Sequence, residues 1–461
     1  MSIIKPIVSS WDVFDTLVTR FLPNPKQVWQ IMAQSYPDLN FAQRRMEAQL
    51  ALDKLGKPYF LLDIYHVLVE LGLTPEMAMT LYAEELKIEF SLLFPIKSAV
   101  ERVAPGDLLI TDMYIPGEII EGWLSEICGL YGQLPIVQSN WGKHTGSIWP
   151  RLLKHYVIRG HSGDNPQSDF AIPGKFHISC NLVTDYKLTP WEQQLLECGG
   201  DQLALIQREA RLRSLGYGAS LYEQIAAGPY VSLLFSYAGF LAQTYENIST
   251  FGFLSRDCDG LSRIFRFLFP TKSAFNINLS RFLINQVENH KIFNAMLPEG
   301  SVLVDVVSTG RSVERLLSSL GRQNLFLTSF LFLDHLMESK AEPSNSMEFV
   351  FRSTDFGNNH YPLEILLQSA YPPVRALEPD PASGGLVRAF GAPEYTPSES
   401  RMILAKNEIV TKFLNVMRSR GAPLLSKEQN LMIMKMSLHR ILNSGLRPEI
   451  FPSFCAREQF L

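Results

Sequence analysis

The sequence predicts an α/β protein built from two domains, and three observations support this prediction. The chain has 461 residues, which is ample for two hydrophobic cores. Short apolar runs of strand character alternate with longer runs of helical character, a pattern typical of parallel sheets with helical crossovers. This alternation occurs twice, on either side of a mostly helical and polar connector near residues 186–215. We therefore place the domains at residues 1–190 and 191–461.

Composition and charge exclude several classes of function. Hydrophobic residues make up 46% and charged residues 19%, as in a soluble globular protein. The net charge is −4 without a long Lys/Arg run, so we expect no nucleic-acid partner. The five cysteines are not closely paired, which favours reduced thiols in a cytoplasm. The N-terminus lacks a signal-peptide pattern, and no apolar run approaches the ~20 residues of a membrane span.

The first domain is expected to begin with a short buried strand at residues 3–11. A helical block follows at about residues 24–94, and its position after the first strand favours a cap over the end of that strand. The alternation then resumes with strands at 107–114, 135–138 and 174–180, helices near 118–130 and 147–156, and a polar loop at 161–169.

The second domain is expected to begin with a helix at residues 221–245. Its core is expected to contain strands at 251–255, 274–280, 301–306 and 324–333, with helices at 259–269 and 311–321. Residues 374–400 are rich in Pro, Gly and Ser and indicate a loop or hairpin. Two helices, near residues 398–420 and 426–444, close the chain.

The most informative stretch is residues 301–317, where a strand runs into a carboxylate and a short loop opens a helix. Backbone N–H groups at a helix N-terminus attract phosphate, and glycine allows the loop to turn tightly. The side chains of Ser308, Thr309 and Ser312 can add hydroxyl donors, and Asp305 can accept hydrogen bonds from ribose hydroxyls. The sequence therefore predicts a ribose-phosphate site here.

Four motifs occur in order in the N-terminal half. They are Asp12-Val13-Phe14-Asp15-Thr16, Thr111 after an apolar strand, Lys143, and the segment from Gly163 to Asp169. This ordered set resembles the haloacid-dehalogenase-like (HAD) hydrolase superfamily over about residues 1–185. The resemblance implies a HAD-like Rossmannoid fold with a helical cap.

The resemblance also implies roles for the motif residues in phosphate-ester hydrolysis. Asp12 would be the nucleophile, which attacks phosphorus once cations neutralise the phosphate charge. Thr111 would hydrogen-bond the transferred phosphoryl group, and Lys143 would neutralise it. Asp164 and Asp169 would hold Mg²⁺ together with Asp12, because that ion prefers hard oxygen ligands.

One position departs from the pattern of the family. Its phosphatases usually carry a second aspartate two residues after the nucleophile, where it is the acid and base for the leaving group; here that residue is Phe14. Asp15 follows one residue later and is the candidate replacement. Proton transfer typically contributes ~10²–10⁴-fold in rate, so losing it would slow the reaction without abolishing binding. The alternative is a HAD-shaped scaffold with a vestigial site.

The segment around Asp305 resembles the signature of type I phosphoribosyltransferases, which bind 5-phosphoribosyl-1-pyrophosphate (PRPP). This implies a phosphoribosyltransferase-like parallel α/β domain with helical additions. Asp305 matches the second of two acidic residues, and Val304 replaces the first. The loop implied to hold the 5-phosphate consists of Ser308, Thr309, Gly310, Arg311 and Ser312.

An earlier turn in the second domain is the matching candidate for pyrophosphate. Ser255 and Arg256 are expected at the pyrophosphate, with Asp257 and Asp259 near Mg²⁺. The alternative for Arg256 and Asp257 is a helix-capping pair with a surface salt bridge. The residues given no role include three scattered histidines, His290, His335 and His360.

Together the two halves resemble two-domain enzymes that add ribofuranose to bacterial surface polysaccharides. The resemblance implies transfer of ribose 5-phosphate from PRPP to a glycan or glycolipid acceptor, followed by removal of the 5-phosphate. The unpaired cysteines favour a cytoplasmic enzyme, and peripheral association with a membrane-bound polysaccharide assembly system stays open. Two alternatives stay open: a stand-alone HAD phosphatase with a C-terminal recognition module, and a non-catalytic protein that senses PRPP or a nucleotide sugar.

Overall fold

The structure is a computed structural model, and it confirms the predicted α/β class with parallel sheets. It describes residues 5–131, 136–138, 142–254, 256–277, 281–284, 286, 293–294, 297–321, 325–336, 347–370, 374–379, 386–390 and 395–453. Two compact units are present: Met1–Thr189 with Leu215–Gly218, and Pro190–Ser214 with Ala219–Leu461. The sequence places its boundary after residue 190, whereas the structure groups Leu215–Gly218 with the first unit.

The first unit contains a five-stranded sheet in the order β5-β4-β1-β6-β7, with every adjacent pair parallel. Its strands are β1 (Ile7–Trp11), β4 (Leu108–Thr111), β5 (Ile136–Gln138), β6 (Val157–Gly163) and β7 (Ser179–Leu182). Its helices outside the helical block are α5 (Lys97–Val100), α6 (Gly117–Cys128), α7 (Gly142–Thr145), α8 (Ile148–His155), η2 (Pro166–Ala171) and α9 (Ile172–Gly174). In chain order the strands lie 3-2-1-4-5, so β1 is central and its carboxyl end lies at the switch point where ligands bind in such sheets.

Two expectations for this sheet were wrong. The polar loop expected at residues 161–169 begins inside β6, whose end pairs with β1 through Trp11 and Ser162. Strand character expected from residue 174 begins only at Ser179. Both segments are rich in polar residues and glycine, so their sequence does not indicate where the strand begins or ends. Pairing with a neighbouring strand decides that boundary.

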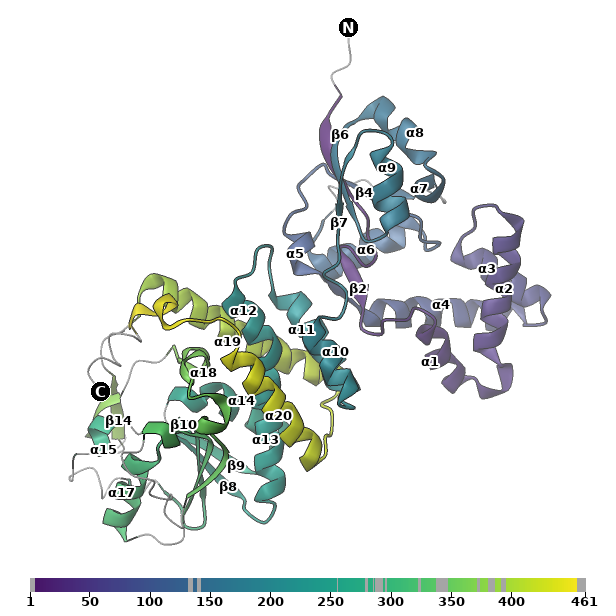
Figure 1. Cartoon of the computed structure of the whole chain (residues 1–461). Coiled ribbons are helices and arrows are strands. Elements are labelled where there is room, and N and C mark those ends of the chain that lie inside the picture. Colours follow the sequence, from purple (N-terminus) through teal and green to yellow (C-terminus); the bar gives the residue numbers. More distant parts are fainter. Residues whose placement is uncertain are drawn as a thin grey trace. The chain divides into compact units, whose positions relative to one another are not determined.

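The helical block consists of α1 (Gln27–Ser35), η1 (Pro37–Leu39), α2 (Phe41–Leu55), α3 (Leu61–Glu70) and α4 (Pro75–Leu92). It has a hydrophobic core of its own and forms a cluster beside the sheet (Figure 1). The short antiparallel strands β2 (Val18–Arg20) and β3 (Leu93–Pro95) pair where the chain leaves and re-enters the α/β core. The block also contacts the segment after β4, because Leu61 N–H donates to the carbonyl of Tyr114 at 2.8 Å.

The second unit contains another five-stranded sheet, in the order β12-β11-β10-β8-β9, again parallel throughout. Its strands are β8 (Thr250–Leu254), β9 (Ser273–Ile277), β10 (Val302–Ser308), β11 (Phe326–Phe332) and β12 (Met347–Arg352). In chain order this is 2-1-3-4-5, so the switch point lies between β8 and β10. The last strand, β12, was absent from the prediction.

Helices complete the second unit. They are α10 (Pro190–Glu197), α11 (Asp201–Ser214), α12 (Leu221–Ile225), η3 (Ala226–Tyr230), α13 (Val231–Thr244), η4 (Arg256–Cys258), α14 (Asp259–Leu268), α15 (Arg281–Ile284), α17 (Arg311–Leu320), η6 (Asp334–Leu336), η7 (Ser353–Phe356), α18 (Tyr361–Leu367), α19 (Pro397–Arg420), α20 (Lys427–Leu442) and η8 (Pro448–Ile450). Much of α11 is buried, so this part of the expected polar connector belongs to the core. The segment expected as a loop or hairpin contains the antiparallel pair β13 (Val374–Pro379) and β14 (Leu386–Phe390).

One helix within the described ranges, Leu221–Thr244, is long and apolar enough to cross a membrane by length and composition, with 89% of its most apolar window buried inside the protein. The sequence predicts a helix at residues 221–245, and the structure confirms it at Leu221–Thr244.

Candidate functional sites

The carboxyl edge of the first sheet gathers the residues of the first site. Asp12 follows β1 directly, and its backbone N–H donates to the carbonyl of Ser162 at 2.8 Å, which extends the pairing of β1 with β6. Thr111 is the last residue of β4, and Asp164 follows the last residue of β6. Because parallel strands end at the same edge, these side chains come from three neighbouring strand ends.

Lys143 links two carboxylates of this site. Its ammonium group, from α7, donates to Asp12 Oδ1 and lies 2.7 Å from Asp169 Oδ1. The lysine and both acids are buried. Asp12 also accepts a hydrogen bond from the Thr16 hydroxyl at 3.0 Å. The candidate nucleophile and the candidate neutralising cation are therefore in direct contact.

Three carboxylates could hold a metal ion. Asp12, Asp164 and Asp169 each offer an oxygen, and these oxygens lie within 4.8 Å of one another. Burial raises the pKa of Asp12 to about 7 and that of Asp164 to about 6, and neighbouring carboxylates add to both shifts. Burial also acts to raise the pKa of Asp169, but hydrogen bonding from His161 and the charge of Lys143 outweigh it and lower that pKa to about 2. Converging hard oxygen ligands with mutual repulsion fit a divalent cation.

The loop after β6 is built closely around Asp169. Its carboxylate accepts a hydrogen bond from the backbone N–H of Asn165 at 3.1 Å. A Cβ added at Gly163 would lie 2.5 Å from the Asp169 side chain, so only glycine leaves room there. Asn165 caps η2 by accepting from the N–H groups of Gln167 and Ser168.

Asp15 has an unusual backbone conformation. Its φ of 57° lies in the left-handed region, and its carboxylate accepts a hydrogen bond from the Thr19 hydroxyl at 2.6 Å. The charge of Asp15 is one cause of the raised pKa of Asp164, so the two carboxylates are near each other. Phe14 instead packs under the guanidinium of Arg20, at 5.2 Å from its ring centroid.

Sequence reasoning missed two residues of this site. Asp112 accepts hydrogen bonds from the backbone N–H groups of Lys143 and His144, at 3.4 and 3.2 Å, and so ties α7 to the end of β4. His161 contacts Asp169 through Nε2 at 3.2 Å and Ser10 through Nδ1 at 2.9 Å. A polar residue directly after a buried strand was the available signal for Asp112. No sequence signal distinguishes His161 from an ordinary core histidine.

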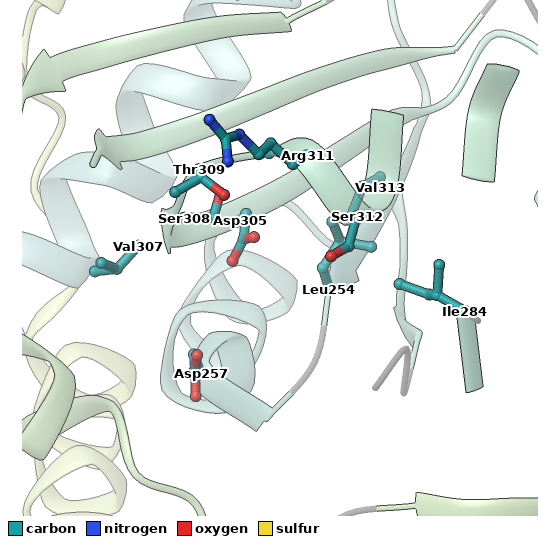
Figure 2. Close-up of a pocket in the computed structure, with 11 residues that line it drawn as sticks. Leu254, Asp257, Ile284, Asp305, Val307, Ser308, Thr309, Arg311, Ser312 and Val313 are labelled. Atoms are coloured by element: carbon teal, nitrogen blue, oxygen red, sulfur yellow. The ribbon is translucent and has the colours of Figure 1, made fainter. Parts of the chain in front are cut away.

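A second site lies at the switch point of the second sheet. Its cavity has a volume of about 140 Å³. It is lined by Leu254, Asp257, Ile284, Asp305, Val307, Ser308, Thr309, Gly310, Arg311, Ser312 and Val313 (Figure 2). The loop after β10 and the turn after β8 therefore share one cavity.

The backbone of the candidate phosphate loop, residues Ser308–Ser312, is suited to binding an anion. Gly310 precedes the first residue of α17 and has a φ of 71°. An added Cβ would lie 2.3 Å from Met347 Sδ, so glycine is required by both conformation and space. The N–H groups at the start of this ten-residue helix face the loop side, where an anion is stabilised.

The two carboxylates of the cavity come from different strand ends. Asp305 lies within β10, and Asp257 lies in η4 after β8, and both line the cavity (Figure 2). Val304 is fully buried and alternates with Asp305 along the strand, so an acid at position 304 would point to the opposite face. Buried Cys258 ties the two walls together by donating to the carbonyl of Val304 at 3.4 Å.

Three residues that the sequence predicts at this cavity are not among its described lining residues. Ser255 and the side chain of Arg256 lie outside the described residues. Asp259 begins α14 and does not line the cavity. Its charge acts instead on the pKa of buried Lys406.

No protein-family model and no curated protein matches the chain. We therefore infer function from the geometry of these two sites.

Proposed function

We propose that the chain is a bifunctional enzyme that transfers ribose 5-phosphate from PRPP to a hydroxyl of a glycan or glycolipid and then removes the 5-phosphate. The observation that carries this proposal is the presence of two phosphate-suited sites of different chemistry. One has a buried aspartate beside a lysine and two further carboxylates. The other has two carboxylates and a hydroxyl-rich loop at a helix N-terminus.

In the transfer site, the residues of the chain bind and orient PRPP. The loop of Ser308–Ser312 would hold the 5-phosphate through backbone N–H groups and hydroxyls. Asp305 would accept hydrogen bonds from ribose hydroxyls, and Asp257 would lie toward the pyrophosphate end with Mg²⁺. Holding the donor in this way leaves C1 exposed to an acceptor hydroxyl, and such positioning is a major source of rate enhancement.

In the hydrolytic site, Asp12 would attack the 5-phosphate of the first product. Lys143 and Thr111 would neutralise and bind the phosphoryl oxygens, and Asp15 would transfer a proton at the ribose oxygen. Mg²⁺, held by Asp12, Asp164 and Asp169, would supply further charge neutralisation when bound. Loss of the phosphate makes the addition of the sugar irreversible. We place both reactions in the cytoplasm, next to a membrane-bound polysaccharide assembly system.

The proposal is tested with PRPP, Mg²⁺ and a lipid-linked glycan fraction from a bacterial cell envelope. The wild-type protein is expected to release pyrophosphate and then inorganic phosphate. Asp305→Asn should release neither, and Asp12→Asn should release only pyrophosphate while a 5-phosphorylated product accumulates, as seen by mass spectrometry. Asp38→Asn, an exposed aspartate of the helical block, is the matched control.

Other results would assign a different function. Phosphate release from sugar phosphates without any pyrophosphate would identify a stand-alone phosphatase. PRPP binding without turnover would identify a binding protein. A dephosphorylated product from Asp12→Asn would remove the phosphatase role from the first site.

A further inference from the structure

Three polar side chains form a continuous chain at the carboxyl ends of β11 and β12. The hydroxyl of Ser353 donates to Asp334 Oδ1 at 2.7 Å, and His335 Nδ1 lies 2.6 Å from the same hydroxyl oxygen. The two strands pair in parallel with Phe332 opposite Arg352, so the residues that follow them meet. His335, which belongs to none of the sequence motifs, is thus one end of a chain of hydrogen-bonded side chains that the sheet brings together.

The hydrogen bond from Ser353 to Asp334 favours one tautomer of the histidine. Ser353 has one hydroxyl hydrogen and donates it to Asp334, so Nδ1 of His335 must donate to the serine oxygen. In the neutral ring this tautomer has its lone pair on Nε2, the arrangement that a general base needs. In a hydrolase triad the histidine lies between the serine and the acid. Here the serine is in the middle, which favours proton abstraction by His335 over nucleophilic attack by Ser353.

Asp334 and His335 follow the strand that pairs with β10, whose last residue lines the second cavity. Ser308 lines that cavity and is paired with Phe332 across β10 and β11. The backbone N–H of Leu333 also donates to the Ser308 carbonyl at 3.0 Å. Asp334 and His335 follow immediately, at the carboxyl edge where α/β sheets bind their ligands.

The surroundings of His335 contain both signs of charge. Arg352 lies 3.9 Å from Asp334, and the ring of buried His360 lies 5.2 Å from that of His335. Glu364 lies 3.9 Å from His360. Burial lowers the pKa of His360, and His335 lowers it further, so His360 adds no positive charge near neutral pH. Hydrogen bonds from Thr354 and Ser353 outweigh burial and lower the pKa of Asp334, which keeps it an anionic acceptor.

We propose that His335 is the general base that takes the proton from the acceptor hydroxyl, with Ser353 and Asp334 as its positioning residues. This inference rests on the proposed function of the second unit. The proton of the acceptor O–H passes to Nε2 as the acceptor oxygen bonds to C1 of PRPP. The bond from C1 to pyrophosphate breaks, and its electron pair leaves with the pyrophosphate. The resulting imidazolium is stabilised through Ser353 by the carboxylate of Asp334.

A purely structural role for the same contacts makes a different prediction. Asp334 also accepts from the backbone N–H and hydroxyl of Thr354, and so caps η7. A capping role requires Asp334 and Ser353 but places no demand on Nε2 of His335. Substitution of the histidine alone therefore separates the two roles.

The experiment compares two nucleophiles that differ in their need for a base. Pyrophosphate release from PRPP is measured with glycerol, which must lose a proton, and with azide, which carries none. His335→Gln is expected to lower glycerol-dependent kcat roughly 10²-fold with little change in KM for PRPP. Azide-dependent release should stay near the wild-type rate. His439→Gln, on exposed positions of α20, is the matched control and should behave as wild type with both.

Each outcome has a defined meaning. If His335→Gln slows both nucleophiles equally or neither, or if wild-type protein binds PRPP but releases no pyrophosphate with glycerol, the general-base role is overturned. If the wild-type protein does not bind PRPP by calorimetry, the proposed function itself fails. Ser353→Ala, expected to lower only the glycerol rate through loss of orientation, provides a second variant if His335→Gln does not fold.

Discussion

The ammonium group of Lys143 lies 2.7 Å from a carboxylate oxygen of Asp169, and both groups are almost excluded from solvent. Burial opposes a charged amine, but the attraction of Asp12 and Asp169 outweighs it and raises the pKa of Lys143. The lysine therefore stays charged at neutral pH beside the carboxylates of Asp12 and Asp169. Its removal would leave buried carboxylates without a compensating charge.

Lys143→Met is expected to reduce both stability and phosphatase activity. Breaking a buried ion pair by removing one partner typically costs about 3–5 kcal/mol, because the remaining charge stays buried. Chemical denaturation measures this loss, and added Mg²⁺ should restore stability more in the variant than in the wild type. Lys175→Met, at an exposed lysine of the same unit, should change little. Equal unfolding free energies for Lys143→Met and wild type would contradict the prediction.

Asp15→Asn is expected to affect hydrolysis according to the leaving group. A sugar 5-phosphate leaves as an alkoxide that needs a proton, so its hydrolysis should fall by roughly 10²-fold. Hydrolysis of p-nitrophenyl phosphate should fall far less, because its leaving group is stable without one. Steady-state kinetics with both substrates gives the ratio, with Asp38→Asn as control. An equal loss on both substrates would assign Asp15 a structural role.

Gly310→Ala is expected to weaken PRPP binding by more than tenfold. The substitution strains a backbone with φ of 71° and pushes a methyl group toward Met347, which displaces the phosphate loop. Gly321 at the other end of α17 has a similar φ of 66° but open space around it. Both variants should lose about 1 kcal/mol of stability from backbone strain. Calorimetry with PRPP should separate them, and a similar affinity for both would show that the loop does not hold the ligand.

Lys406 should make the stability of the second unit depend on alkaline pH. Complete burial lowers its pKa to about 8, although Asp259 and Asp257 act in the opposite direction. Between pH 8 and the unfolded value of 10.5 the unfolded chain binds more protons, so stability rises with pH across this window. The rise contributed by this lysine is about 3 kcal/mol.

Urea denaturation at about pH 7 and about pH 10 tests this effect. The wild type should gain stability relative to Lys406→Met as the pH rises, since the variant lacks the titrating group. Lys435→Met, at an exposed lysine of α20, should follow the wild type. A constant difference between wild type and Lys406→Met would mean that Lys406 keeps its usual protonation behaviour.

Much of the candidate chemistry was readable from residue order. Asp12, Lys143, Asp164 and Asp169 stand in motifs whose spacing relates them to strand ends, and the structure brings them together. Asp305 and the loop after it were likewise found as a strand, a carboxylate and a helix start. Such motifs can be recognised in the sequence because each one consists of a single strand and the turn that follows it.

Contacts between distant segments were not readable in this way. The pairing of β11 with β12 brings His335 to Ser353, but the sequence did not predict β12. Asp112 gained partners only when α7 came to the end of β4, and His161 gained Asp169 when the loop after β6 turned back on its strand. Asp257 joins Asp305 because β8 and β10 are neighbours in the sheet order.

The sequence by itself determined the α/β class, the strand-end aspartates and the glycine loop, since strand periodicity and turn chemistry are local properties. The tertiary structure alone decided the strand order and the burial that shifts the pKa values of Asp12 and Lys406. It also decided which polar side chains share one edge of a sheet. These properties depend on packing between segments that are far apart in the chain. The free energy of that packing cannot be inferred from a local sequence pattern.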